Sequence, residues 1–430
     1  MINKIDFFLK KLYPINRSLT GQGNRITLKS LKEIIPLRIK SIKSLTKVYD
    51  WVVPLEWKIS DAFISDESGN KIIDFKKNNL HLISYSNKIN KKISWNQLKK
   101  KLYFSQKSIN AIPYRTSYYN NDWGFCVTKL QYNLLKNLKG KYKIFINSKF
   151  IKGTMNYGEY LIRGKSKKEI LISTYICHPS MANDNLSGLI LTAFLAKYIS
   201  KIKNLNWSYR VVFVPETIGA ISYCKLNEIK MKKISYGLVV TCVGGPGKFS
   251  FKQSWNKDHF INKITRKVLK KKGYKFDIKK FDITGSDERQ YSSQAFKINT
   301  VTVSKDQYYT YKQYHTSLDN LQFVKAGNIY KTLGVYKEII KNFEKRKTYV
   351  VTNKFCEAML SKHNLYPKIG GEILPKENKY SNISLTMWVL YLSDGSNTIN
   401  EIAKKLQVST KLLKKINNKL VKKNLLKLNK

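Results

Sequence analysis

The chain contains few cysteines, and it has neither a long apolar run nor a leader-like start. Its five cysteines are odd in number and lack Cys-x-x-Cys spacing, so we expect most of them to be small buried hydrophobes rather than a disulfide framework. The apolar patch before Lys10 is shorter than that of a signal peptide. The longest apolar stretch, around residues 188–196, is well below the roughly 20 residues that cross a bilayer. These absences predict a cytoplasmic protein without a membrane partner.

Acidic residues are also scarce. The 430 residues include 80 Lys and Arg but only 28 Asp and Glu, which gives a net charge of +52. Such an excess ordinarily indicates an anionic partner such as nucleic acid. The lysines, however, are spread over the whole chain among many Asn and Ile residues, which favours a solvated coat produced by AT-rich codons. A dedicated polyanion site is the alternative interpretation.

Strand and helix patterns alternate between residues 142 and 344. The segments "KEILISTYIC" and "YRVVFVPE" are nearly continuous apolar runs, as in strands buried on both faces of a parallel sheet, and each precedes a helix-like segment. A helix at 259–273, a strand at 298–304 and a closing helix at 321–344 follow. This alternation predicts an α/β fold with a mixed, largely parallel sheet flanked by helices.

Two regions depart from this alternation. Residues 45–135 are rich in aromatic and β-branched stretches, with a hairpin turn expected at 68–70. Near the C-terminus two helical periods are separated at 408–410, where Ser409 or Thr410 would cap the second helix. The predicted parts are a discontinuous catalytic domain (1–44 and 136–350), an inserted β-rich module (45–135), and a winged helix-turn-helix domain (351–430) with a loop-rich junction at 353–382.

Ionisable side chains follow several of the predicted strands. They are His178 and Asp184 after the first, Glu216 after the second, Asp287 in the later loop "TGSDERQY", and His315 after the strand at 298–304. Ligands of open α/β sheets bind beyond the carboxyl ends of the strands, where loops converge. Imidazoles and carboxylates from separate loops form the mixed nitrogen and oxygen set that Zn²⁺ prefers. The pattern therefore predicts a zinc site.

Each of these residues also has an ordinary structural interpretation. A single histidine at a strand end is more often hydrogen-bonded or on the surface than a metal ligand. Asp184 alone could cap the helix that follows it, and Glu216 could be a strand-end charge. His81, His259 and His363 lack comparable neighbours and are interpreted as ordinary histidines. The joint pattern carries the zinc-site prediction.

Four motifs in order, "CHPSMANDNLSG", "FVPETIGAI", "GSDERQY" and "YHTSLDN", resemble an aminopeptidase-like family associated with polysaccharide-biosynthesis loci. That family is a distant relative of bacterial zinc aminopeptidases and glutaminyl cyclases. The resemblance extends from the opening "LYPINRSLTG" through "KVYDWVVPLEW", "NNLHLISYS" and "IPYRTSYYNNDWGFC" to the winged-helix-like C-terminal segment. It covers nearly the whole chain and implies a zinc-aminopeptidase-like fold.

The resemblance implies a role for each matching residue. Glu216 matches the glutamate that acts as general base. Asp319, four residues after His315, is a candidate for orienting the site through hydrogen bonds, and capping of the final helix is the alternative. The implied metal ligands are His178, Asp184 as the bridge between two metals, Asp287 on the first metal and His315 on the second.

Two positions depart from the pattern of the zinc aminopeptidases. Where these carry two consecutive glutamates, the base and then a metal ligand, this chain has Glu216 followed by Thr217, a poor zinc ligand. Either the second metal is weakly held or absent, or Glu216 is itself a ligand and the base is missing. Ser180 stands where relatives place an aspartate that orients the first histidine, and its loss would loosen the imidazole. We expect one zinc ion.

Three functions fit these features. The first, which we expect, is a zinc-dependent hydrolase of an amide bond in an aminoacyl or N-acyl substrate, either a small molecule, a peptide or a glycan-linked compound. The second is a catalytically inactive metal-binding scaffold. The third is a nucleic-acid-binding regulator whose C-terminal segment reads bases with Asn417 and Asn418. Its phosphate contacts would come from Lys404, Lys405, Lys411, Lys414, Lys415 and Lys419.

Overall fold

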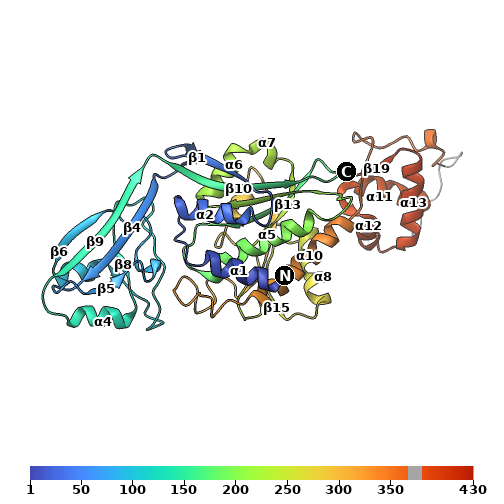
Figure 1. Cartoon of the computed structure of the whole chain (residues 1–430). Coiled ribbons are helices and arrows are strands. Elements are labelled where there is room, and N and C mark those ends of the chain that lie inside the picture. The colour runs from blue at the N-terminus through green and yellow to red at the C-terminus, as the bar shows by residue number, and fades with distance from the viewer. Residues whose placement is uncertain (367–379, 430) are drawn as a thin grey trace. The chain divides into compact units, whose positions relative to one another are not determined.

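A computed structural model describes residues 1–366 and 380–429, and the chain divides into two compact units, residues 1–341 and 342–430 (Figure 1). An eight-stranded sheet is the centre of the first unit, with the strand order β1-β10-β12-β11-β13-β16-β14-β15. Its middle strands, β12 (Ser208–Val214), β11 (Glu169–Tyr175), β13 (Ile234–Val239) and β16 (Asn299–Lys305), are parallel. The carboxyl ends of these four strands therefore lie at the same edge.

The apolar runs of the sequence account for the buried centre of this sheet. Every residue of β11 and β12 is buried, as expected of strands covered on both faces. Antiparallel pairing places β1 (Arg38–Lys43) and β10 (Thr154–Ile162) on one side, and β14 (Phe249–Lys252), paired in parallel with β15 (Phe276–Lys279), on the other. The flanking helices include α1 (Ile2–Leu12), α2 (Gln22–Leu31), α5 (Gly188–Ile199), α6 (Ile218–Leu226), α8 (Phe260–Lys271) and α10 (Ala326–Lys345). The predicted α/β fold with a mixed, largely parallel sheet is confirmed.

A second, antiparallel sheet forms the β-rich part of the first unit. Its strand order is β5-β4-β9-β6, from β4 (Glu56–Ser65), β5 (Lys71–Asp74), β6 (Ile89–Ile93) and β9 (Tyr142–Ile151). The predicted hairpin turn joins β4 to β5, where Gly69 adopts a φ of +88° that favours glycine. Trp57 and Ile64 of this sheet belong to the same hydrophobic cluster as Leu171 of β11, so the two sheets share buried apolar surface.

The second unit has its own hydrophobic core. A three-stranded sheet, β18-β17-β19, is formed by β17 (Thr348–Val351), β18 (Asp394–Thr398) and β19 (Leu426–Leu428). It accompanies α11 (Asn382–Leu392), α12 (Ile399–Lys405) and α13 (Thr410–Lys422), and Ser409 is the N-cap residue of α13 as expected. Residues 367–379 of the predicted junction lie outside the described residues. The predicted winged helix-turn-helix architecture is confirmed by these elements.

The expected role of Asn417 in base reading is wrong. Asn417 is 3% exposed, whereas Asn418 is exposed. Leu413, Asn417 and Leu420 are buried together because the spacing of four and three residues places them on one face of α13. None of the helices within residues 1–366 and 380–429 combines the length and apolar character that a membrane crossing requires.

Candidate metal centre

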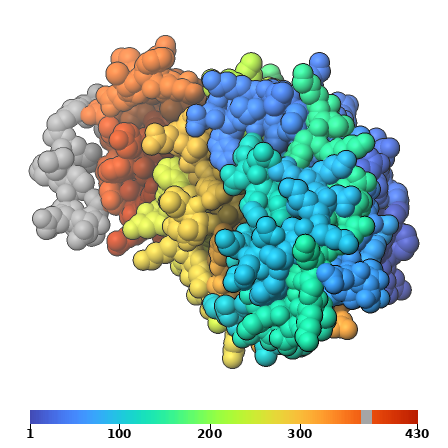
Figure 2. Space-filling view, turned by 90° about the vertical axis from the view of Figure 1, so that its left-hand side faces the viewer, coloured from blue at the N-terminus to red at the C-terminus, as the bar shows by residue number. Residues whose placement is uncertain are grey.

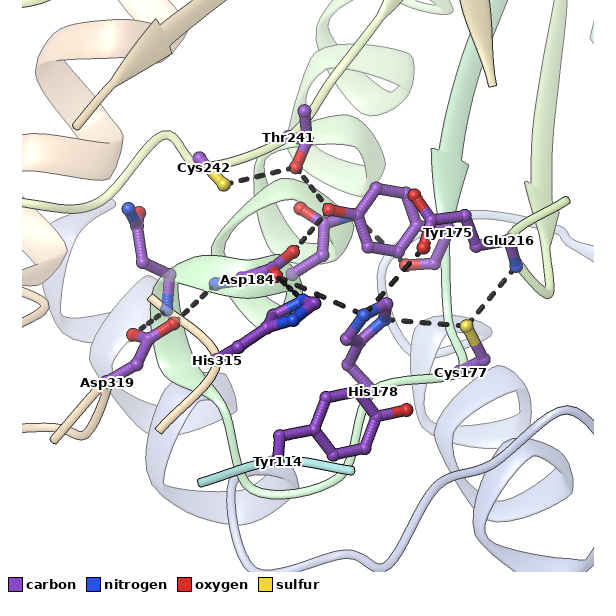
Figure 3. Close-up of polar contacts among 12 residues, drawn as sticks. Tyr114, Tyr175, Cys177, His178, Asp184, Glu216, Thr241, Cys242, His315 and Asp319 are labelled. Atoms are coloured by element: carbon purple, nitrogen blue, oxygen red, sulfur yellow. Dashed lines mark hydrogen bonds and ion pairs between the residues drawn. The ribbon is translucent and has the colours of Figure 1, made fainter. Parts of the chain in front are cut away.

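Loops at the carboxyl ends of three parallel strands meet at one place. His178 follows β11, Glu216 follows β12, and His315 lies in the long loop between β16 and α10. Asp184 lies in the turn that leads into α5. Figure 3 shows the carboxylate of Asp184 beside the imidazoles of His178 and His315, with a dashed line to each. This convergence is what the parallel sheet provides.

Asp184 and the two histidines form a compact set of possible ligands. The Nε2 atoms of His315 and His178 lie 3.0 and 4.0 Å from Oδ2 of Asp184. Within the part of the chain that the structure describes, this buried Oδ2 atom accepts no hydrogen bond of ordinary geometry. One ligand atom from each of the three residues lies within 4.8 Å of the others, so a single cation could contact all three.

The chemistry of this set fits zinc. Two imidazole nitrogens and a carboxylate oxygen are common zinc ligands, and three protein ligands leave a position for water or substrate. A buried carboxylate oxygen without a hydrogen bond is costly unless a cation or donor satisfies it. The unsatisfied Oδ2 of Asp184 is therefore the observation that best fits a bound metal.

The protonation states of these side chains also favour metal binding. Burial lowers the pKa of His178 to about 4, so its imidazole is neutral at neutral pH. Burial alone would raise the pKa of Asp184, but the nearby His178 and His315 outweigh this effect and lower it to about 2. Neutral imidazole and ionised carboxylate are the forms that coordinate metals.

Asp184 is held from both sides by hydrogen bonds. Oδ2 of Asp319 accepts the backbone N–H of Asp184 over 2.9 Å, and Oδ1 accepts that of Asn183 over 2.6 Å. The hydroxyl of Tyr175 donates to Oδ1 of Asp184, and it also lies 2.7 Å from Oγ1 of Thr241. Asp319 thus fixes the backbone of the loop, while Tyr175 fixes the carboxylate itself.

Glu216 and Asp287 form a pair of carboxyl groups beside this set. Oε2 of Glu216 lies 3.8 Å from Nε2 of His178. Burial raises the pKa of Glu216 well above its usual range, and the charges of Asp287 and Asp184 raise it further. Burial likewise raises the pKa of Asp287 to about 7. The raised pKa makes this carboxylate a stronger base than an ordinary glutamate, which suits it to accept and return a proton.

Asp287 faces the Glu216 loop. Its Oδ1 accepts the backbone N–H of Thr217 over 2.8 Å, and its buried Oδ2 has no hydrogen-bond partner among the residues described. Asp287 is absent from both groups of possible ligands found among residues 1–366 and 380–429. Oγ1 of Thr217 accepts a hydrogen bond from Nη2 of Arg289 over 3.2 Å. The structure thus brings Asp287 next to Glu216 rather than into the His178, Asp184 and His315 set.

Cys177 joins the loop of Glu216 to His178. Its Sγ atom lies 3.4 Å from Nδ1 of His178 and accepts the backbone N–H of Glu216 over 3.3 Å. Cys177, His178 and Glu216 form the second group of closely placed possible ligands. Burial raises the pKa of the thiol well above its usual range, so the thiol is neutral and acts as a weak hydrogen-bonding partner.

The β-rich part of the first unit contributes one wall of the site. The backbone N–H of Tyr114 donates to the carbonyl oxygen of His315 over 2.7 Å. The Tyr114 ring lies 5.2 and 5.3 Å from the imidazole centres of His178 and His315. In Figure 2 the blue and cyan surface of the earlier residues borders the yellow surface of later ones. This segment therefore positions His315 from outside the main sheet.

The residues at the strand ends can be predicted from the sequence, whereas the residues that support them have little or no signal there. Tyr175 and Cys177 belong to the "ISTYIC" run that directly precedes His178. Their polar atoms are the only local sign of a supporting role. Tyr114 lies in the "IPYRTSYYNNDWGFC" motif, which carries no chemical signature of its own. Asp319 lies where its spacing from His315 suggested, and it contacts the Asp184 loop rather than the start of α10 at Ala326.

Residues 7–346 match the model of the family described as Domain of unknown function (DUF4910). The chain belongs to this family. Residues 347–428 match the winged helix-turn-helix family. A relative from Clostridium acetobutylicum, named for polysaccharide biosynthesis and an aminopeptidase-like domain, is 41% identical over 420 residues, covering 98% of this chain and 95% of the relative. The family indicated by the four motifs is confirmed.

Solved structures show the same architecture. A Clostridium acetobutylicum protein described as a peptidase has a TM-score of 0.80 at 39% identity, and the match covers 100% of this chain and 96% of that protein. BSAP, a zinc aminopeptidase from Bacillus subtilis, has a TM-score of 0.55 at 12% identity, over 80% of this chain and 94% of that enzyme. At 12% identity the likeness concerns the fold. This DUF4910 protein therefore has an aminopeptidase-like fold.

Proposed function

We propose that this protein is a zinc-dependent hydrolase that cleaves an amide bond. The observation that carries the proposal is the convergence of His178, Asp184 and His315 around the unsatisfied Oδ2 of Asp184, with Glu216 alongside. A zinc ion held by these three residues would act as a Lewis acid toward the substrate carbonyl and the attacking water. We propose one zinc ion per chain, since Thr217 offers no strong second ligand.

The proposed work of Glu216 is proton transfer. Its raised pKa lets the carboxylate take a proton from the attacking water and return it to the leaving amine. Asp287 supports this role because its negative charge raises the pKa of Glu216, an effect second only to that of burial. The contact of Cys177 with the Glu216 backbone keeps this carboxylate on the same side as the two imidazoles.

The proposed substrate is an aminoacyl or N-acyl compound, a peptide or a glycan-linked amide. The name of the Clostridium acetobutylicum relative, which joins polysaccharide biosynthesis to an aminopeptidase-like domain, supports a sugar-linked amide in particular. Chromogenic aminoacyl amides and N-acyl amino sugars form the test panel, with zinc supplied.

The variant Glu216→Gln tests the hydrolase. It keeps the shape of the side chain but removes proton transfer, so kcat should fall about 10²-fold or more while zinc stays bound. Glu228→Gln is the matched control, since Glu228 is an exposed surface glutamate paired with Tyr49 and Lys225. Hydrolysis at the wild-type rate by Glu216→Gln would contradict the base assignment. Zinc binding without hydrolysis of any panel compound would favour the inactive scaffold.

The second unit supports an alternative, binding of nucleic acid. Lys411, Lys414, Lys415 and Lys419 are exposed along α13 and could contact phosphates. Binding to duplex DNA should then weaken steeply with salt, and replacing these four lysines by Gln should abolish it. No binding at low salt would exclude this function.

A further inference from the structure

Arg17, in the opening motif "LYPINRSLTG", is a buried cation beside the candidate metal centre. Its side chain is 1% exposed. Nε donates to the carbonyl oxygen of His178 over 2.8 Å, and Nη1 donates to that of Leu12 over 2.6 Å. Nη2 is buried and has no hydrogen-bond partner in the described part of the chain. A buried charge whose only hydrogen-bond partners are neutral costs free energy, so the buried position of the Arg17 guanidinium needs an explanation.

A second set of hydrogen bonds ties the same loop to the same N-terminal segment. Oγ of Ser180 donates to the carbonyl oxygen of Tyr13 over 3.0 Å. Nδ2 of Asn79 donates to Oγ of Ser180 over 2.7 Å. The carbonyl of His178 and the side chain of Ser180 are thus bound by groups that lie 161, 167 and 101 positions away in sequence.

Among the described residues, Nδ1 of the His178 imidazole has no carboxylate or carbonyl partner. A metal-binding histidine commonly donates its second N–H to a carboxylate, a carbonyl or water. Here Nδ1 of His178 faces Sγ of Cys177 at 3.4 Å, and sulfur is a weak acceptor. A weakly held ring takes its direction from its own backbone. The backbone carbonyl of residue 178 is the group that Arg17 binds.

We propose that Arg17 is a positioning residue for His178, and that the Arg17 and Ser180 hydrogen bonds replace a carboxylate on the imidazole as the device that aims Nε2 at Asp184. This inference rests on the proposed zinc site. It assigns a function to the opening motif, whose conformation brings Tyr13 and Arg17 to the loop that carries His178.

Zinc affinity of the full chain tests the proposal, measured by competition with a chromogenic chelator. Arg17→Gln should raise the zinc Kd about 10-fold or more, the usual effect of losing a group that orients a ligand. Ser180→Ala should raise it less, in the same direction. The visible absorption spectrum of the cobalt-loaded chain, which reports ligand geometry, should change in Arg17→Gln.

Arg25→Gln is the matched control. Arg25 lies in the adjoining helix α2 and pairs with the buried Glu56 over 2.7 Å, so its loss destabilises the same region without touching the His178 loop. It should leave zinc affinity and the cobalt spectrum unchanged. Wild-type affinity in a folded Arg17→Gln chain would overturn the proposal. If that variant does not fold, Ser180→Ala decides, and unchanged affinity there overturns it. A wild-type chain that binds no zinc would overturn the proposed function itself. Wild-type zinc binding together with unchanged affinity in the variants would overturn only the role of Arg17.

Discussion

The carboxylate of Asp319 accepts the backbone N–H of Asp184 over 2.9 Å, although 135 positions separate the two residues. The other oxygen of Asp319 accepts the N–H of Asn183, so this buried side chain fixes two consecutive peptide groups of the metal loop. Asp319 therefore links the loop before α10 to the loop after β11.

Replacing Asp319 by Asn should weaken zinc binding about 10-fold to 100-fold, because an amide cannot accept both N–H groups with the same strength. Zinc competition with a chelator measures this change. Asp306→Asn is the control, since Asp306 lies in the same loop but accepts the N–H of Gly247 instead. Equal losses in the two variants would show that loop stability, rather than the Asp184 contact, determines affinity.

Asp287→Asn should alter proton transfer while leaving zinc in place. Removing the charge of Asp287 lowers the pKa of Glu216, since that charge is the second cause of its elevation after burial. The acidic limb of the pH–rate profile should move to lower pH. Zinc content by mass spectrometry distinguishes this role from the ligand role that the family resemblance implies, in which case the variant would lose its metal.

The stability of the metal-free protein should fall between about pH 5 and pH 8. Burial raises the pKa of Asp319 and of Asp287 to about 7, and it raises that of Glu216 as well. The folded state therefore holds protons that the unfolded chain has released above about pH 4, so unfolding becomes easier as pH rises through the folded pKa values. The pKa of His178, lowered to about 4, has the opposite effect on stability below about pH 6.5, where the unfolded chain binds a proton that the folded histidine does not. This single group offsets only one of the three carboxyl groups.

Thermal unfolding at several pH values, with and without zinc, measures this dependence. Zinc should raise Tm at both pH 5.5 and pH 8, because His178 and Asp184 are already in their metal-binding forms at pH 5.5. Asp319→Asn should flatten the pH dependence of the metal-free form. A metal-free protein that becomes more stable between pH 6.5 and pH 8 would contradict these pKa shifts.

Local sequence patterns were sufficient for the sheet and for the meeting of the strand-end residues. The buried strands β11 and β12 are apolar throughout, so their burial on both faces can be predicted. Parallel strands then bring His178 and Glu216 to one edge, and they start the loop that carries His315 at the same edge. The same periodicity could have predicted the burial of Asn417, which shares the face of Leu413 and Leu420.

Contacts between distant loops could not be predicted in this way. Arg17 binds the carbonyl of His178 across 161 positions, and Tyr114 binds that of His315 from another part of the chain. Side-chain rotamers and loop paths determine such pairs, and neither leaves a periodic trace in the sequence. The position of Asp287 against Thr217 has the same origin, since it depends on how the loop before α9 (Glu288–Tyr291) approaches the residues that follow β12.

Zinc stoichiometry tests the central claim most directly. The full chain, reconstituted with zinc and dialysed, should contain one zinc ion, and His178→Ala and His315→Ala should each lose it, whereas His363→Ala in the second unit should keep it. Zinc that stays bound in both site variants, or a wild-type chain that holds none, would contradict the account.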